Sequence, residues 1–197
     1  MLRAAVVVHS VMGNTYLLAK CYTQVLRKLG VETDLYRVRD DTYEEVSLQY
    51  EPGKEYREEI LSLPVAGCGA DMVGYDMLFL GSPTYYGCVS AQMKAFMDSF
   101  CDIWVEAKMA GTYFGCFATC GDTFGGGELC LQVMNTFAQH MGMIPVSVPC
   151  NTGGAPQPAY GILHITGGDS GQRMGGDIGK SIHGYLEFVL ANTGKRG

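Results

Sequence analysis

Short runs of consecutive apolar residues recur along this chain of 197 residues, separated by segments with the period of a helix. Near-continuous apolar runs of strand length indicate strands that are buried on both faces, as in a parallel sheet. The apolar runs cover residues 4–8, 31–36, 77–80, 113–118 and 144–148, and the helical segments cover 15–29, 91–100, 128–141 and 177–191. This alternation predicts right-handed βαβ units, and therefore an α/β fold with a doubly wound, five-stranded parallel sheet and helices on both faces.

Two segments are longer than this minimal pattern requires. Residues 40–74 are rich in Glu, Tyr and Pro, with a possible short helix over 54–62, and residues 150–176 are rich in Gly and Pro and read as a loop. Loops longer than about 12–15 residues in a compact domain are usually functional or disordered. Because the sequence contains neither repeats nor a linker, we expect one domain over residues 1–197.

Charge and composition exclude several classes of protein. Basic residues number 14 against 20 acidic ones, and this mild acidity disfavours nucleic acid or an anionic membrane surface as a partner. No stretch approaches the roughly 20 apolar residues of a membrane span, and no targeting segment is visible. The eight cysteines form no CxxC pair, so no metal site is predicted. Reduced thiols in a cytoplasmic protein are the simplest reading.

The loop after the first apolar run is the first functional signal, because ligands of open parallel sheets bind outside the carboxyl ends of the strands. The loop consists of Ser10, Val11, Met12, Gly13, Asn14 and Thr15. Its hydroxyls, and the backbone N–H groups that open the next helix, suit an anion. It lacks the lysine of a nucleoside triphosphate loop and the GxGxxG pattern of a dinucleotide site. A single terminal phosphate fits this loop, although an ordinary capped turn is an equal alternative on these residues alone.

Two further apolar runs are followed by loops whose residues also suit a ligand. The loop after 77–80 contains Ser82, Pro83, Thr84, Tyr85, Tyr86 and Gly87, and the loop after 113–118 contains Thr119, Cys120, Gly121, Asp122, Gly125 and Gly126. The first supplies flat aromatic rings, and the second supplies backbone N–H groups. A planar heteroaromatic phosphate matches such a site, so the predicted cofactor is FMN.

At this point the residues resemble the flavodoxin superfamily and, within it, the WrbA-type NAD(P)H:quinone oxidoreductases. The block from Gly81 to Gly87, continued by Ser90-Ala91-Gln92-Met93, is similar to the family's GTPTRFG…SGQM pattern, and Tyr160-Gly161 with Gly167-Gly168-Asp169 matches its YG…GGD signature. The resemblance covers nearly the whole chain except roughly residues 42–70. The chain departs from the family at Met12, Tyr85, Cys120 and Asp122.

The resemblance implies roles for these residues. Residues 10–15 would hold the FMN phosphate, and the loops at 84–86 and 119–126 would contact the ribityl chain and the isoalloxazine. His140, at a helix end, would also approach the flavin. Trp104, the single tryptophan, would line the substrate face together with Met12. The family further implies a homotetramer in which neighbouring subunits complete each site.

The resulting functional prediction is an FMN-dependent oxidoreductase that transfers two electrons from NAD(P)H to a quinone, without a side chain acting as acid or base. Two alternatives stay open on the sequence. The chain could be a flavodoxin-type electron carrier, although carriers of this superfamily tend to be strongly acidic. It could also be an FMN-binding protein without turnover, because of the departures at Met12 and Tyr85.

Overall fold

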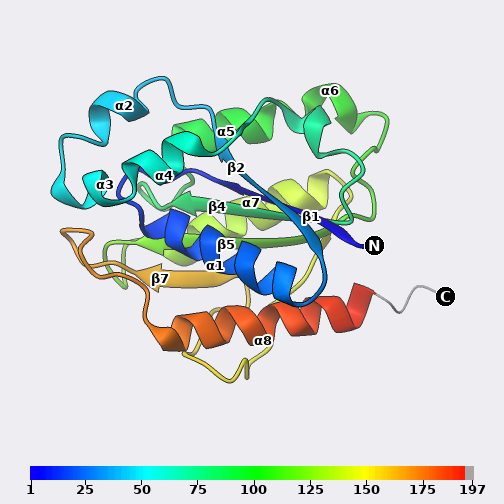
Figure 1. Ribbon diagram of the computed structural model, residues 1–197. Coiled ribbons are helices and arrows are strands. Elements are labelled where there is room, and N and C mark those ends of the chain that lie inside the picture. Colours follow the sequence, from blue (N-terminus) through cyan, green and yellow to red (C-terminus); the bar gives the residue numbers. More distant parts are fainter. Residues whose placement is uncertain (194–197) are drawn as a thin grey trace.

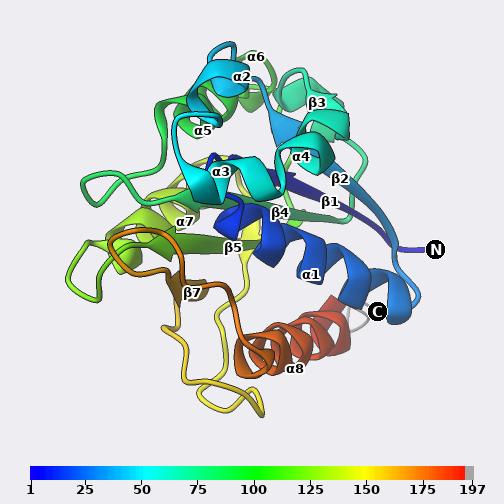
Figure 2. The same ribbon diagram turned by 60° about the vertical axis from the view of Figure 1, so that its left-hand side comes forward.

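The computed structural model of the protein describes residues 1–193, which form a parallel sheet between two layers of helices (Figures 1 and 2). Within this part of the chain the sheet has seven strands, in the order β3-β2-β1-β4-β5-β6, with β7 also paired to β5. The strands are β1 (Arg3–Val8), β2 (Glu32–Val38), β3 (Val65–Ala66), β4 (Met77–Pro83), β5 (Tyr113–Cys120), β6 (Ile144–Pro145) and β7 (Ile162–Ile165). The predicted fold class is confirmed.

The sheet departs from the predicted five strands for two reasons. Strand β6 pairs with the start of β5 at Tyr113 and Phe114, whereas β7 pairs with its end, from Phe117 to Cys120. Strands β6 and β7 therefore follow one another along the same edge of β5, and residues 146–161 lie between them in the sequence. The predicted strand over 144–148 corresponds only to β6. The two-residue strand β3 adds a further edge beside β2.

Successive side chains of the central strands point to opposite faces of the sheet, so the core is divided between the two helical layers. In β1, Ala4, Val6 and Val8 face α1 (Asn14–Lys28) and α8 (Gly176–Thr193), while Ala5 and Val7 face the other side. That second layer consists of α5 (Ala91–Asp98), α6 (Cys101–Trp104) and α7 (Gly127–His140). Burial on both faces explains the unbroken apolar runs of these strands.

The segment between β2 and β4 contains short helices rather than a structureless loop. They are α2 (Tyr43–Val46), α3 (Glu51–Glu55), α4 (Arg57–Ser62) and the 3-10 helix η1 (Gly69–Met72). The possible helix over 54–62 is broken at Tyr56, whose backbone leaves the helical region. A small cluster of Tyr16, Tyr43 and Ile60 packs α2 and α4 against α1. This segment therefore lies beside the loop that precedes α1.

The segment over 150–176 is mostly a loop, as predicted, but it also contains β7. The strand has only four residues, and the polar His164 interrupts its apolar run, so periodicity did not reveal it. None of the helices described over residues 1–193 has the length and hydropathy needed to cross a membrane.

Candidate cofactor site

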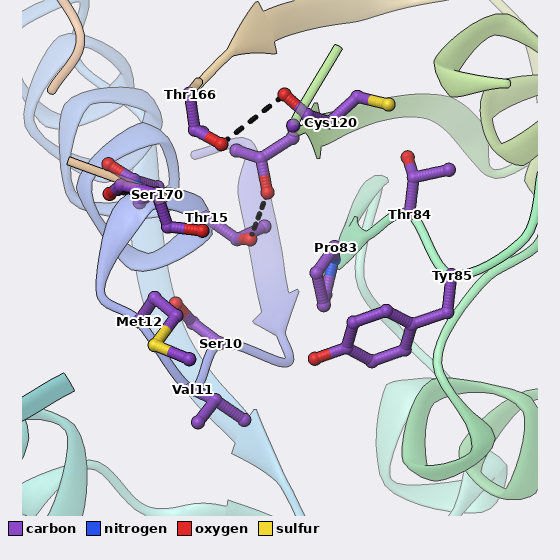
Figure 3. Close-up of a pocket in the computed structure, with 13 residues that line it drawn as sticks. Ser10, Val11, Met12, Thr15, Pro83, Thr84, Tyr85, Cys120, Thr166 and Ser170 are labelled. Carbon is purple, nitrogen blue, oxygen red and sulfur yellow. Dashed lines mark hydrogen bonds between the residues drawn. The ribbon is translucent and has the colours of Figure 1, made fainter. Parts of the chain in front are cut away.

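A cavity of about 130 Å³ opens at the carboxyl ends of β1, β4 and β5 (Figure 3). Three loops predicted from the sequence meet there, together with a fourth segment that follows β7. The lining residues are Ser10, Val11, Met12, Asn14, Thr15, Pro83, Thr84, Tyr85, Thr119, Cys120, Gly121, Thr166 and Ser170. The sequence placed all of these in the site except Thr166 and Ser170.

The loop from Ser10 to Thr15 presents unused hydrogen-bond donors to an anion. Gly13 has a φ of 86°, which glycine adopts at little cost, and it begins α1 without a side-chain cap. Within residues 1–193 the backbone N–H groups from Ser10 to Thr15 meet no acceptor, and the buried hydroxyl of Ser10 has no partner. Buried polar groups are nearly always satisfied, so unsatisfied donors at a helix N-terminus indicate an anionic ligand. The loop therefore fits a phosphate group.

Two hydroxyl contacts hold the floor of the cavity together (Figure 3). Thr15 Oγ1 lies 2.8 Å from Thr119 Oγ1, which joins the start of α1 to the end of β5. Thr166 Oγ1 donates to the Cys120 carbonyl at 3.3 Å, which joins β5 to the segment after β7. These bonds explain how loops from distant parts of the sequence keep one arrangement.

Tyr85 and Tyr86 are adjacent in sequence but point to different places. They belong to a tight turn in which the Tyr85 N–H donates to the Cys88 carbonyl and the Cys88 N–H donates back to the Tyr85 carbonyl. Tyr86 and Gly87 both have positive φ, at 54° and 76°, as a two-residue hairpin turn of this type requires. The Tyr85 ring therefore faces the cavity (Figure 3), whereas the Tyr86 side chain is fully exposed.

Several predicted contact residues shape the site without lining the cavity. The Ser82 hydroxyl accepts from the Ser90 N–H at 2.9 Å and so fixes the start of α5. A Cβ on Gly126 would lie 2.7 Å from Gly87 Cα, so these glycines let two loops approach closely. Other predicted residues that do not line the cavity are Gly13, Asp122 and Gly125.

Trp104 and His140 lie together, but at the other end of the sheet. Trp104 Nε1 donates to the His140 carbonyl at 2.9 Å. Helix α7 begins beside the cavity at Gly127 and ends at His140, just before the amino ends of β5 and β6. Its 14 residues span roughly 21 Å at 1.5 Å per residue. Within one chain, these side chains therefore stay far from the cavity.

The side chain of Arg173 is a further part of the site that the sequence did not single out. It donates to the Met12 carbonyl at 2.7 Å and to Asn14 Oδ1 at 3.0 Å. The Asn14 side chain in turn donates to the Ser170 carbonyl at 2.7 Å. The YG…GGD signature marked this part of the chain, but it identified none of these contacts.

A buried hydrogen bond between His9 and Asp40 lies next to the first loop. His9 Nε2 donates to Asp40 Oδ2 at 3.0 Å, and both side chains are almost fully buried. This hydrogen bond, with two more from Thr42, holds the pKa of Asp40 well below its ordinary value. Burial, reinforced by the negative charge of Asp40, raises the pKa of Tyr85, so this phenol stays neutral at the cavity. No cluster of metal-binding side chains occurs within residues 1–193.

The comparisons with known proteins agree with this geometry. The family model for NADPH-dependent FMN reductases matches residues 3–154. The chain belongs to the NADPH-dependent FMN reductase family. An NAD(P)H dehydrogenase (quinone) of Archaeoglobus fulgidus is 35% identical over 150 residues, which cover 76% of this chain and 78% of the relative. A protein of the same name from Methanosarcina acetivorans is 28% identical over 187 residues and covers 88% of each chain.

A solved structure of a WrbA-like flavodoxin from Agrobacterium tumefaciens has the same fold. Its TM-score is 0.70 at 19% identity, and the match covers 99% of this chain and 100% of the other. Together with the family model and the NAD(P)H dehydrogenase (quinone) relatives, this likeness confirms the resemblance to the WrbA-type family. The loop from Ser10 to Thr15, the Tyr85 ring and Gly121 of the glycine-rich loop meet at one cavity, and the donors that they offer fit FMN.

Proposed function

We propose that this FMN reductase family member is an FMN-dependent enzyme that transfers two electrons from NAD(P)H to a quinone. The observation that carries the proposal is the set of acceptor-free N–H groups from Ser10 to Thr15, next to the Tyr85 ring in one cavity. Relatives matched over most of their length are NAD(P)H dehydrogenases (quinone), which supports the same electron donor and acceptor here.

When bound, FMN would supply the hydride and two-electron chemistry, and the protein would supply binding, orientation and electrostatics. In this proposal the Ser10 hydroxyl and the loop N–H groups hold the phosphate. Thr84 lines the cavity next to Tyr85 and would contact the ribityl chain or the ring edge. The Tyr85 ring provides a flat surface for the isoalloxazine.

We propose that neighbouring subunits complete each site. Trp104 and His140 lie too far from their own cavity, yet Trp104 is 54% exposed and its neighbour Val105 is 87% exposed. In the loop after β5 and in the first turn of α7, the apolar side chains of Phe124 and Leu129 are exposed as well. Contact between these two surfaces in a homotetramer would bury both and would bring Trp104 of one subunit to the substrate face of another, beside Met12.

Two further expectations remain predictions. The chain would form one domain over residues 1–197, and it would work in the cytoplasm. The free thiols of all the described cysteines support a reducing compartment.

Anaerobic rapid mixing tests the proposed function. The FMN-loaded protein is mixed with NADH or NADPH while the flavin absorbance is followed, and a quinone is added afterwards. We expect the absorbance to bleach within the turnover time and to return on addition of the quinone. A protein that holds FMN but bleaches with neither nucleotide would be a carrier or a binding protein, and the proposal would be wrong.

A further inference from the structure

Arg173 connects three segments that are far apart in the sequence. Its guanidinium bonds Met12 and Asn14 in the loop that precedes α1, and it bonds the Pro52 carbonyl at 3.0 Å. It also forms an ion pair with Glu55 at 2.6 Å and lies over the ring of Tyr56, 5.3 Å from its centre. One side chain from the segment after β7 therefore ties the phosphate loop to α3.

Every donor of this guanidinium is already used. Arginine has five N–H donors. Nε donates to Glu55, one terminal nitrogen donates to Met12 and Asn14, and the other donates to Pro52 and Glu55. No donor is left for a ligand, so in this arrangement Arg173 holds the protein and does not bind the phosphate.

The bond to the Met12 carbonyl determines which way the loop's peptide groups point. A trans peptide is planar, so its C=O and the following N–H point in opposite directions. With the Met12 carbonyl turned to Arg173, the N–H of Gly13 points away from the guanidinium. A Cβ on Gly13 would meet Tyr56 at 2.7 Å and Arg173 at 3.5 Å, so both side chains pack against the outside of this loop. The contact thus leaves the Gly13 N–H free for a ligand.

The contacts of Asn14 with the segment after β7 also help to fix the conformation of this loop. The Asn14 amide group accepts from Arg173 and donates to the Ser170 carbonyl, and Ser170 itself lines the cavity. The side chain of Arg173 is only 23% exposed, so its bonds are partly shielded from water. Partly buried, charge-assisted hydrogen bonds of a planar guanidinium are the contacts that fix geometry most firmly.

We propose that Arg173 is a positioning residue that sets the conformation of the phosphate loop for the terminal phosphate of FMN. The proposal rests on the proposed function in that FMN is the ligand. It assigns Arg173 no contact with the flavin ring and no step in electron transfer. Its effect is therefore confined to the phosphate end of the cofactor.

Titration of apoprotein with FMN and with riboflavin, which lacks the phosphate, tests this role. The variants are Arg173→Met and Arg173→Lys, and the control is Arg39→Met, which removes an exposed arginine paired only with Asp41. We expect Arg173→Met to raise the Kd of FMN about tenfold or more and to leave the Kd of riboflavin unchanged. Arg173→Lys should recover only part of the loss, because an ammonium has three donors and no planar fork. Arg39→Met should bind FMN as the wild-type protein does.

Three results would overturn the positioning role. The first is an unchanged FMN Kd in Arg173→Met, and the second is an equal rise in the Kd values of FMN and riboflavin in that variant. The third is a wild-type FMN Kd in Arg173→Lys, which would show that only the positive charge at this position matters. Riboflavin binding also reports whether each variant is folded. If wild-type apoprotein binds no FMN at all, the proposed function fails instead, so the two failures are distinguishable.

Discussion

Ser10 carries a buried hydroxyl group that meets no partner within residues 1–193, on the loop that precedes α1 at the cavity. An unsatisfied buried hydroxyl costs free energy, and a ligand that supplies the missing partner recovers it. Thr15 differs, because its hydroxyl already contacts Thr119 and so fixes the end of β5 as well as facing the cavity. The site therefore presents hydrogen-bond donors that the fold leaves free for a ligand.

Replacing both Ser10 and Thr15 by alanine should therefore weaken FMN binding strongly. Each lost hydrogen bond to a charged phosphate is worth about 1.5–3 kcal/mol. The measurement is the Kd of FMN by quenching of flavin fluorescence. Thr23→Ala is the matched control, because that hydroxyl bonds the Ala19 carbonyl within α1 and lies away from the cavity. Unaltered FMN affinity in the double variant would show that this loop does not hold the phosphate.

Because of Asp40, the free energy of unfolding should depend on pH in the acidic range. Its pKa is lowered first by the hydrogen bond from His9, so the folded state favours the carboxylate over the protonated form. The resulting stabilisation is present above the ordinary pKa of 3.8 and is lost as the pH falls below it towards the folded-state pKa.

Asp40→Asn should accordingly lower the free energy of unfolding at pH 7 by roughly 1–3 kcal/mol, and should flatten its decline below about pH 4. Urea unfolding at a series of pH values measures both effects. Asp41→Asn, which removes an exposed carboxylate paired with Arg39, is the control. Parallel pH curves for the wild-type protein and Asp40→Asn would contradict this account of the pair.

At the scale of elements, continuous apolar runs predicted β1, β4 and β5 well, because these strands are buried on both faces. The same signal could not show that one strand position is shared by β6 and β7, since strand pairing depends on contacts distant in the sequence. The break between α3 and α4 at Tyr56 was equally invisible. Thr166, Ser170 and Arg173 were missed because their role comes from tertiary contacts, which no local motif records.

The Tyr85–Cys88 turn contains a testable backbone strain. Tyr86 adopts a left-handed conformation that costs a non-glycine residue about 1 kcal/mol, and its exposed side chain offers no contact in return within the subunit. Tyr86→Asn should therefore raise the free energy of unfolding by about 0.5–1 kcal/mol, because asparagine tolerates this region. Gly87→Ala is the opposing control and should destabilise, since Gly87 has a φ of 76°. Destabilisation by Tyr86→Asn would indicate that the Tyr86 side chain is packed in the assembled protein.

At the scale of the whole molecule, the cofactor cavity and the Trp104–His140 contact lie at opposite ends of the sheet. Parallel strands bring the three predicted loops to one end, which is why the sequence could predict them as one site. The same topology places the end of α7 at the other end of the sheet. A site that includes Trp104 or His140 therefore requires a second subunit.

Light scattering on the FMN-loaded protein should give about four times the 21.3 kDa mass of the chain. Trp104→Ala should keep FMN bound while lowering turnover with a quinone, because stacking orients planar reactants. Val105→Ala, at the next exposed position, is the comparison for a change that affects assembly alone. An FMN-bound monomer with full turnover would contradict completion of the site by neighbouring subunits.

We propose that this chain binds FMN in one cavity and uses it to pass two electrons from NAD(P)H to a quinone. If nicotinamide and quinone stack on the same open flavin face, the first product must leave before the quinone enters. Initial rates measured over a grid of NAD(P)H and quinone concentrations test this order directly. We expect parallel lines in double-reciprocal plots. Intersecting lines, or no NAD(P)H oxidation above that of free FMN, would contradict it.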